Sequence, residues 1–354
     1  MLPDPDQNPL LSLVGRFPRL RALAWNADQL YAGRGYELLR ARIHDSTVVE
    51  WELVASFRPS LRRTLTVTNR LTARLFRDGF HALAVLPTGA LVGAVPGAII
   101  TAAPKQSEFR TTHAITRGTR PLHITAVPSG MIFWGEYFDN TDRDEVHIYA
   151  SSDAGASWSV AYTFPKCAIR HVHNIVHDPF ADCLWILTGD YGDECRILRA
   201  TCDLSRVETV LQGNQQARAV ALVPMPDALY FTTDTPLEAN FVYRFDRAGK
   251  LARVSPISSS SIYGCRVGSR VFFSTMVEPS EVNRDRNVRI YAGSGDHWEP
   301  MLAWRKDRRS MRFFQYGNAF LPGGNNETLY LAVSPIAVKQ EDQTTSLFAT
   351  LPQP

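Results

Sequence analysis

Short apolar runs separated by turn-forming residues dominate the chain, and helical periodicity is scarce. The segments DALYFTTD, DCLWILTGD, SRVFFSTM and ETLYLAVSP each begin at a polar turn and continue as an apolar or alternating stretch. Stretches of about four to eight residues with this pattern, bounded by Gly, Pro, Asp and Asn, are typical of β-strands. The pattern therefore predicts an all-β protein.

A further strand signal precedes these runs and recurs seven times along the chain. The seven segments are RALAW from Arg21, HALAV from His81, HITAV from His123, HNIVH from His173, RAVAL from Arg218, YGCRV from Tyr263 and YGNAF from Tyr316. Successive segments start 42 to 60 residues apart, and each interval has room for three or four strands. Units of about 40–50 residues with four strands each are the signature of a β-propeller. We therefore expect a seven-bladed β-propeller with four-stranded blades.

The last unit, from Tyr316, has room for only three strands: QYGNAFL, TLYLAV and TSLFATL. The N-terminal segment LLSLVGRF (Leu10–Phe17) can supply the missing one. An N-terminal strand that joins the last blade would close the ring and remove an open sheet edge. Length alone favours two domains, but the repeat predicts a single propeller domain over residues 1–354.

Composition and charge narrow the function classes. The formal net charge is only +3 at pH 7, so we expect neither nucleic acid nor a membrane as partner. No run approaches the roughly 18 apolar residues that a membrane-spanning helix needs. The N-terminal segment lacks the basic region and long apolar core of a signal peptide. These features predict a cytoplasmic protein, or a secreted one if a leader has been removed.

One short motif connects the chain to a known class of propellers. The segment Ser151–Trp158 reads SSDAGASW and matches the Asp-box pattern Ser-x-Asp-x-Gly-x-Ser/Thr-Trp. In a hairpin turn, Asp153 would accept bonds from turn amides, Gly155 would adopt a positive φ, and Trp158 would pack beneath. On these residues the chain resembles the Asp-box (BNR) β-propellers of the sialidase-like superfamily. The resemblance implies a structural turn on the outer strands, away from any active site.

The first residues of the seven innermost strands should meet at one mouth of the central channel. They are three histidines, two arginines and two tyrosines: Arg21, His81, His123, His173, Arg218, Tyr263 and Tyr316. Solvation of a wet channel mouth would explain any one of them. As a set they are the groups expected where an acidic substrate is bound and protons are moved. In this interpretation His171 and His177 only flank the ring.

Further polar residues should border the same mouth. The second strand of a blade runs antiparallel to the first, so its end reaches the same side, and three of these ends carry an acid: Glu136, Asp190 and Asp234. Turn capping is the alternative role for these carboxylates. Arg120 and Arg170 each lie three residues before a ring histidine. Either arginine would reach over the mouth or pair with Glu136 or Asp190.

The ring favours β-elimination at a uronic acid in an oligosaccharide or polysaccharide. That reaction needs a cation on the sugar carboxylate, a base for the C5 proton and an acid for the leaving oxygen. We expect His123, His173 and Tyr263 to transfer protons and Arg218 to neutralise the carboxylate. The remaining ring members and the neighbouring acids and arginines would then contact the substrate. This architecture resembles the propeller-fold polysaccharide lyases, some of which bind a metal.

Two other function classes remain open. A glycoside hydrolase would use two carboxylates from Glu136, Asp190 and Asp234, although the Arg-Ile-Pro that sialidases carry near the start is absent. A non-catalytic glycan-binding or scaffold propeller would need no such site. We expect no cofactor; the alternative is a divalent metal held by His81, His123 and His173.

Overall fold

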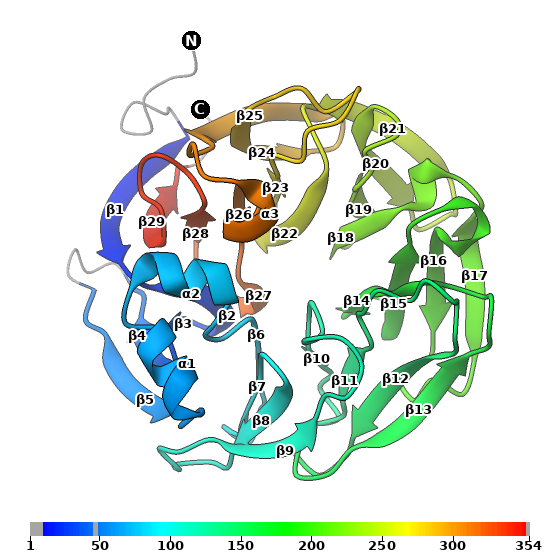
Figure 1. Cartoon of the computed structure of the whole chain (residues 1–354). Helices are drawn as coiled ribbons and strands as arrows, with labels where there is room; N and C mark the ends of the chain where they lie inside the picture. The colour runs from blue at the N-terminus through cyan, green and yellow to red at the C-terminus, as the bar shows by residue number, and fades with distance from the viewer. Residues whose placement is uncertain (1–9, 45–48, 352–354) are drawn as a thin grey trace.

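In the computed structural model, which describes residues 10–44 and 49–351, seven β-sheets stand around a central channel (Figure 1). This arrangement confirms the predicted all-β, seven-bladed propeller. Six sheets contain four strands and one contains five. Within each sheet the strands run antiparallel from the channel outward in chain order, except in the last sheet and at one added strand.

The strands of the first three sheets follow from the inside outward. They are β2 (Arg21–Ala27), β3 (Gln29–Arg34), β4 (Glu37–Arg42) and β5 (Glu52–Ser56); β6 (Ala82–Val85), β7 (Leu91–Val95), β8 (Ala98–Ala102) and β9 (Arg110–Ala114); and β10 (Thr125–Ala126), β11 (Ile132–Gly135), β12 (Val146–Ser151) and β13 (Ser159–Phe164).

The next three sheets repeat this plan. They contain β14 (His171–Asp178), β15 (Cys183–Gly189), β16 (Arg196–Ala200) and β17 (Val207–Gln212); β18 (Ala219–Pro224), β19 (Ala228–Thr233), β20 (Asn240–Asp246) and β21 (Leu251–Ile257); and β22 (Ser261–Val267), β23 (Arg270–Thr275), β24 (Asn287–Ser294) and β25 (His297–Arg305). Two short 3₁₀ turns, η2 (Gly192–Glu194) and η3 (Gln215–Ala217), lie in connections of this part.

The seventh sheet closes the ring as predicted. It contains β26 (Asn318–Phe320), β28 (Tyr330–Ile336), β29 (Thr344–Thr350) and, outermost, the N-terminal strand β1 (Leu11–Pro18). Strands β1 and β29 pair antiparallel from Leu11 opposite Thr350 to Pro18 opposite Thr344, with a bulge after Leu13. The two ends of the described chain therefore belong to one sheet (Figure 1).

A second link across this seam was not predicted. The short strand β27 (Gly323–Asn326) leaves the seventh blade and pairs parallel to β2, so the first sheet has five strands. Gly324 makes the approach possible: its φ is +87°, and a Cβ there would lie 2.2 Å from the carbonyl oxygen of Trp25. Only glycine tolerates both conditions.

The core is divided among the gaps between neighbouring sheets. Seven clusters of buried apolar residues each draw on two adjacent blades. A sheet with a neighbour on each face buries both of its faces, which explains continuous apolar runs such as β15, where every residue is buried. Phe272, Ile290 and Phe348 belong to the cluster between the sixth and seventh sheets.

Two short helices explain the longest interval of the repeat. Helices α1 (Leu61–Thr66) and α2 (Arg70–Phe76) are inserted between β5 and β6, and α3 (Met311–Phe314) precedes the seventh sheet. In Figure 1 all three lie in front of the blades near the seam. The buried guanidinium of Arg74 joins α2 to distant loops, because it contacts Asp307 at 2.8 Å and Asp342 at 3.2 Å. None of the helices in the described part of the chain could cross a membrane.

The Asp-box segment forms the predicted turn between β12 and β13. The Asp153 carboxylate accepts bonds from the Ser157 amide at 2.9 Å and the Ser157 hydroxyl at 2.6 Å. Gly155 has a φ of +83°, and the Trp158 indole donates to Thr112. A similar turn one blade later is held by Asp203. The motif is a hairpin turn on the outer strands.

The packing between sheets predicts the cost of a cavity between the sixth and seventh sheets. Phe348 is only 1% exposed, so Phe348→Ala should lower the free energy of unfolding by about 3–5 kcal/mol. Leu53 is 58% exposed, and Leu53→Ala should change the same quantity by less than about 0.5 kcal/mol. Guanidinium denaturation measures both. Equal losses in the two variants would contradict the described packing.

Candidate functional site

The structure gathers most of the predicted ring at one mouth of the channel, but in two distinct halves. Arg21, His81, His123 and Tyr263 are half-buried and lie with Arg120 in a basic half. His173 and Arg218 are buried and lie with Asp190 and Asp234 in a carboxylate half. The accessible groups and the buried groups therefore belong to different parts of the ring.

Tyr316 stands apart from both halves. Its side chain is 39% exposed, and β26 begins two residues later, at Asn318. Phe320 takes the corresponding place of the seventh blade, since its ring lies 3.4 Å beneath the Arg21 guanidinium carbon and 4.8 Å from the Tyr263 ring. The sequence pattern located this strand but placed its start at Tyr316, two residues before β26 begins.

The basic half is centred on Arg21, the first residue of β2. Its guanidinium donates to the backbone carbonyls of Phe80 and His81, both at 3.1 Å, and to the His81 Nδ1 at 3.3 Å. The His81 Nε2 donates to the Arg77 carbonyl at 2.7 Å. These bonds fix the His81 tautomer, with its proton on Nε2. The buried Nε of Arg21 has no hydrogen-bond partner among the residues that the structure describes.

The guanidinium groups of Arg21 and Arg120, and that of the neighbouring Arg77, have no counter-charge in the part of the chain that the structure describes. Within residues 10–44 and 49–351, no carboxylate oxygen lies within 4 Å of Arg21, Arg77 or Arg120. Burial, followed by the charges of Arg21 and Arg77, lowers the pKa of Arg120 to about 10. Burial likewise lowers the pKa of Arg21 to about 10. Cations held close together without a carboxylate are a ready-made site for an anion.

Two groups capable of proton transfer lie beside these cations. The His123 and Tyr263 rings approach edge to face at 6.0 Å between centroids. Burial, followed by the charges of Arg21 and His173, lowers the pKa of His123 to about 4. Burial raises the pKa of Tyr263, although Arg21 and Arg120 act in the opposite direction. At neutral pH the imidazole is therefore a free base and the phenol keeps its proton.

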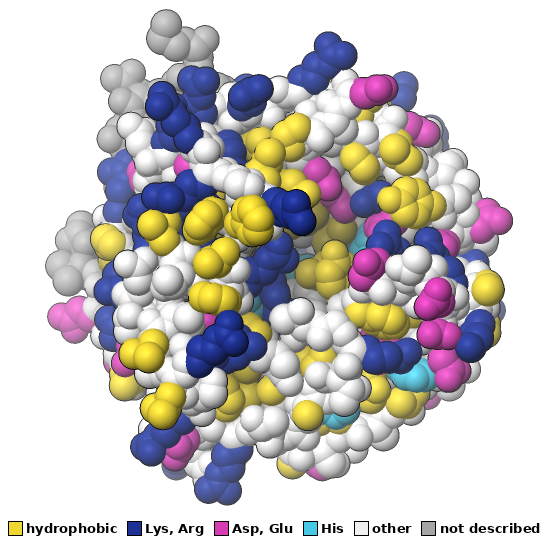
Figure 2. All heavy atoms as spheres, in the orientation of Figure 1, with side chains coloured by type: hydrophobic (Ala, Val, Ile, Leu, Met, Phe, Trp, Pro, Cys, Tyr) yellow, Lys and Arg dark blue, Asp and Glu magenta, His cyan; other side chains and the backbone are white. Residues whose placement is uncertain are grey.

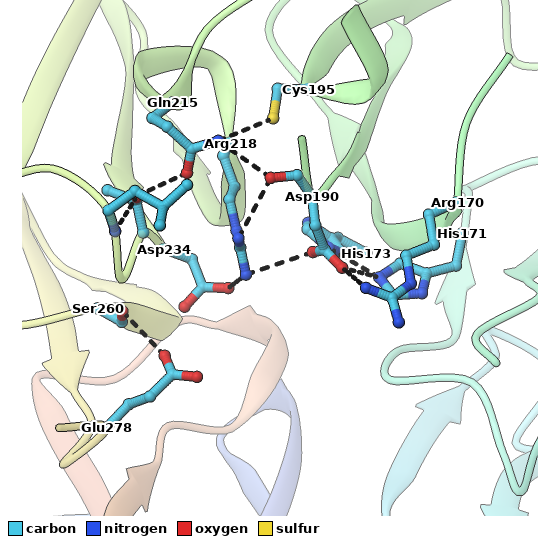
Figure 3. Close-up of polar contacts among 12 residues, drawn as sticks. Arg170, His171, His173, Asp190, Cys195, Gln215, Arg218, Asp234, Ser260 and Glu278 are labelled. Atoms are coloured by element: carbon cyan, nitrogen blue, oxygen red, sulfur yellow. Dashed lines mark hydrogen bonds and ion pairs between the residues drawn. The ribbon is translucent and has the colours of Figure 1, made fainter. Parts of the chain in front are cut away.

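The carboxylate half is centred on Asp190, directly after β15 (Figure 3). Its carboxylate contacts Arg170 at 3.1 Å, His173 at 3.2 Å, Arg218 at 3.3 Å and His171 at 3.6 Å. The preceding residue must be small, because a Cβ on Gly189 would lie 2.7 Å from Cε1 of His173. Of the alternatives considered for Arg170, the structure has the pairing with Asp190.

His171 was expected only to flank the ring, and the structure corrects this expectation. Its Nε2 lies 3.2 Å from the Nε2 of His173, and both residues are buried. The ring of Tyr137 packs against His171 at 4.3 Å between centroids. The sequence could have indicated this, because residues two positions apart in a strand, such as His171 and His173, lie on the same face.

Asp234 extends the carboxylate half toward the fifth and sixth blades. It lies 3.8 Å from Arg218, and its Oδ1 has no hydrogen-bond partner among the described residues. Burial raises the pKa of Asp234 to about 7. Glu278, which follows the second strand of the sixth blade and was not predicted, accepts a bond from Ser260 at 3.2 Å (Figure 3).

Glu136 belongs to neither half. Its carboxylate pairs with Arg117 and accepts a bond from the His147 amide at 2.8 Å. Arg117 therefore takes the place beside Glu136 that we considered for Arg120. The metal alternative of His81, His123 and His173 is also divided, since His81 bonds to Arg21 and Arg77 while His173 faces His171 and Asp190.

A cavity of about 890 Å³ opens beside the basic half, between the blades and helices α1 and α2. Arg21, Arg77, His81 and Phe320 form its wall at the channel mouth, and Leu61 and Arg70 lie on the helical side. Figure 2 shows Arg and Lys side chains in the central hollow and around the helices. A pocket of this size accommodates an extended ligand of several rings.

Comparison with known proteins supports the fold but identifies no family. No protein-family model matches the chain, and no curated protein matches it. Among solved structures, the WD40 propeller domain of Doa1 superposes with a TM-score of 0.58 at 8% identity, covering 96% of each chain. A chain of the mitotic checkpoint complex gives 0.57 at 10% identity, covering 100% of this chain and 97% of that one. These likenesses concern the propeller fold alone.

The contacts of Asp190 predict a large effect of its removal. Asp190→Asn leaves Arg170 and Arg218 facing a neutral amide in a buried cluster, so the free energy of unfolding should fall by about 3–5 kcal/mol. Asp139 is the other, 76% exposed partner of Arg170, and Asp139→Asn should cost less than about 1 kcal/mol. Chemical denaturation of the two variants provides the comparison. A loss in Asp190→Asn no larger than that of its control would refute this account.

Proposed function

We propose that this propeller binds an acidic oligosaccharide at the channel mouth and cleaves it by β-elimination at a uronic acid. The observation that carries the proposal is the group of three guanidiniums without a carboxylate partner beside His123 and Tyr263. The resemblance of the Ser151–Trp158 motif to Asp-box propellers, and of the ring to propeller-fold lyases, is consistent with it. Fold alone does not give this function.

The uronate carboxylate is bound by Arg21 and Arg120, with Arg77 at the rim. We had expected Arg218 in this role, but Arg218 already faces Asp190 and Asp234. An arginine that lacks a carboxylate gains most from an anionic ligand, because it needs no exchange of partners. The neutralised carboxylate makes the neighbouring C5 proton more acidic. The adjoining cavity holds the remaining sugar residues.

His123 accepts the C5 proton and Tyr263 gives its phenolic proton to the leaving oxygen. The C4–O bond breaks as the double bond between C4 and C5 forms, so one product carries the double bond and the other a new hydroxyl. The protonation states favour this assignment, because His123 is neutral and Tyr263 is protonated at pH 7. His173 is less suited to the step, since its nitrogens face Ala219, His171 and Asp190.

A glycoside hydrolase is the second candidate, and one observation favours it. Asp234, with a pKa of about 7, is protonated in a large fraction of molecules at neutral pH, whereas the two guanidiniums beside Asp190 favour its ionised form. Carboxyl groups with divergent pKa values form the acid and base or nucleophile of many glycosidases. Both groups are only 7% exposed, which disfavours direct contact with a sugar.

An ultraviolet absorbance screen against oligosaccharides of different uronic acids tests the proposal. The wild-type protein should generate the absorbance of a double bond conjugated to the carboxylate. Arg21→Ala should lower kcat/KM by about 10²–10³-fold, and Tyr263→Phe by about 10²–10⁴-fold. Arg206 pairs with Glu208 at the surface and is 74% exposed. Arg206→Ala removes the same charge and should leave kcat/KM unchanged.

The outcomes separate the three classes of function. A saturated reducing end without the absorbance would favour the hydrolase and overturn the lyase. Binding of a uronic-acid oligosaccharide without any product would identify a non-catalytic propeller. Full activity in Tyr263→Phe would exclude the phenol as the acid.

The pH dependence tests the role of His123 separately. Protonated imidazole cannot accept the C5 proton, so kcat/KM should be constant near neutral pH and fall as the pH drops through about 4, the pKa of His123. An ordinary histidine would place this fall near pH 6.5. His123→Asn should abolish the step, and a fall already complete at pH 6 would argue against His123 as the base.

A further inference from the structure

We propose that His171, His173 and Asp190 form a binding site for one divalent transition-metal ion, with Zn²⁺ as the best match. The site is distinct from the basic half of the mouth and does not depend on the proposed β-elimination. Its three side chains come from the start of β14 and from the residue directly after β15. All three residues are buried, and one ligand atom of each lies within 4.8 Å of the others.

The hydrogen bonds on the far side of each imidazole determine which nitrogen is free. The Nδ1 of His171 lies 3.0 Å from the carbonyl oxygen of Phe138, and the Nδ1 of His173 lies 2.9 Å from that of Ala219. A carbonyl only accepts, so each Nδ1 carries a proton. In the neutral rings each Nε2 therefore presents a lone pair. Metal-binding histidines usually have this outer bond from the second nitrogen.

The two lone pairs point to the same place as the Asp190 carboxylate. The Nε2 atoms lie 3.2 Å apart, and Asp190 oxygens lie 3.2 Å from His173 and 3.6 Å from His171. Lone pairs that face one another repel, and a cation between them removes the repulsion. Figure 3 shows the three groups facing one another.

The spacing fits tetrahedral coordination. Zinc bonds of about 2.0–2.1 Å to nitrogen and oxygen place tetrahedral ligand atoms roughly 3.3–3.4 Å apart. The separation of 3.2 Å between the two Nε2 atoms, and the 3.2 Å from His173 Nε2 to the Oδ1 of Asp190, are close to this value. The other carboxylate oxygen, Oδ2, is the one that lies 3.6 Å from His171. Two imidazoles and one carboxylate are also a ligand set found in zinc sites, where a fourth position remains for water or another ligand.

The charges around Asp190 support the carboxylate as a ligand. Arg170 and Arg218 hold its oxygens at 3.1 and 3.3 Å, as outer partners commonly hold a metal-binding carboxylate. Arg170 also pairs with Asp139, so its positive charge is shared between two carboxylates. This sharing reduces the repulsion that a divalent ion would meet.

A second group of side chains that could bind a metal ion serves as a comparison for the proposed site. His177, Asp182 and Cys202 also converge on the described surface, but the Asp182 side chain is 89% exposed. No bond fixes the His177 tautomer through its other nitrogen among the described contacts, and the third member is a thiol. Binding at this cluster would therefore produce a different spectrum.

The test uses Co²⁺ as a spectroscopic substitute for Zn²⁺ on the full-length protein after treatment with a chelator. We expect one equivalent to bind and to give the visible bands of tetrahedral Co²⁺ without a thiolate charge-transfer band in the near ultraviolet. Zn²⁺ should displace it and raise the Tm of the apoprotein. Loss of an outer partner already costs about 10–100-fold in affinity, so His171→Gln should weaken binding by more than about 100-fold.

His177→Ala is the matched control, because it removes a histidine of the same strand from the other cluster and should leave Co²⁺ affinity unchanged. If His171→Gln fails to fold, the wild-type spectrum still decides, because the presence or absence of a thiolate band shows which of the two clusters binds Co²⁺. Absence of Co²⁺ and Zn²⁺ binding, a thiolate charge-transfer band, or loss of binding in His177→Ala alone would each overturn the proposal. Since the readout is metal binding, the result is independent of lyase activity.

Discussion

The pairing of the first strand with the last one is the constraint on which the rest of this structure depends. A propeller sheet buries both of its faces against neighbours, so no sheet is stable at an open end. The β1–β29 ladder and the β27–β2 ladder both join strands near the end of the described chain to strands near its start. Closure fixes the circumference and therefore the distance between side chains that face each other across the channel.

Because the circumference is fixed, side chains from repeats far apart in the sequence come into contact, and no short sequence motif is needed to bring them together. Arg21 and Tyr263 are separated by 242 positions in the numbering, yet both contact the Phe320 ring. The mouth then separates into a half with free cations and a half in which cations and carboxylates are paired. Holding guanidiniums together without counter-charge costs folding free energy, and such local costs are typical of functional sites.

The sequence was sufficient to predict the features that depend on the strand pattern and on the position of a residue within its repeat. The strand pattern predicted the number of blades, the closing role of the N-terminal strand and the meeting of Arg21, His81, His123 and Tyr263 at one mouth. Turn chemistry predicted the Asp153 hairpin. These features follow from local geometry that every repeat shares.

Features that depend on partners far away in the chain were not predictable. Helices α1 and α2 are too short to be marked by periodicity, and Arg74 holds α2 through Asp307 and Asp342. The pairing of Arg218 with two acids, and of Glu136 with Arg117, depends on side-chain directions that strand order does not specify. Tyr316 was misplaced because the inner strand of the last blade is only three residues long.

The contacts of Arg74 also have a consequence for the order of assembly. Its two carboxylate partners lie 233 and 268 residues further along the chain, so this anchor of α2 beside the large cavity forms only after the last blades have been made. The arginine-rich compartment is therefore completed late in biosynthesis. A nascent or C-terminally shortened polypeptide would have several finished blades and still lack a ligand compartment.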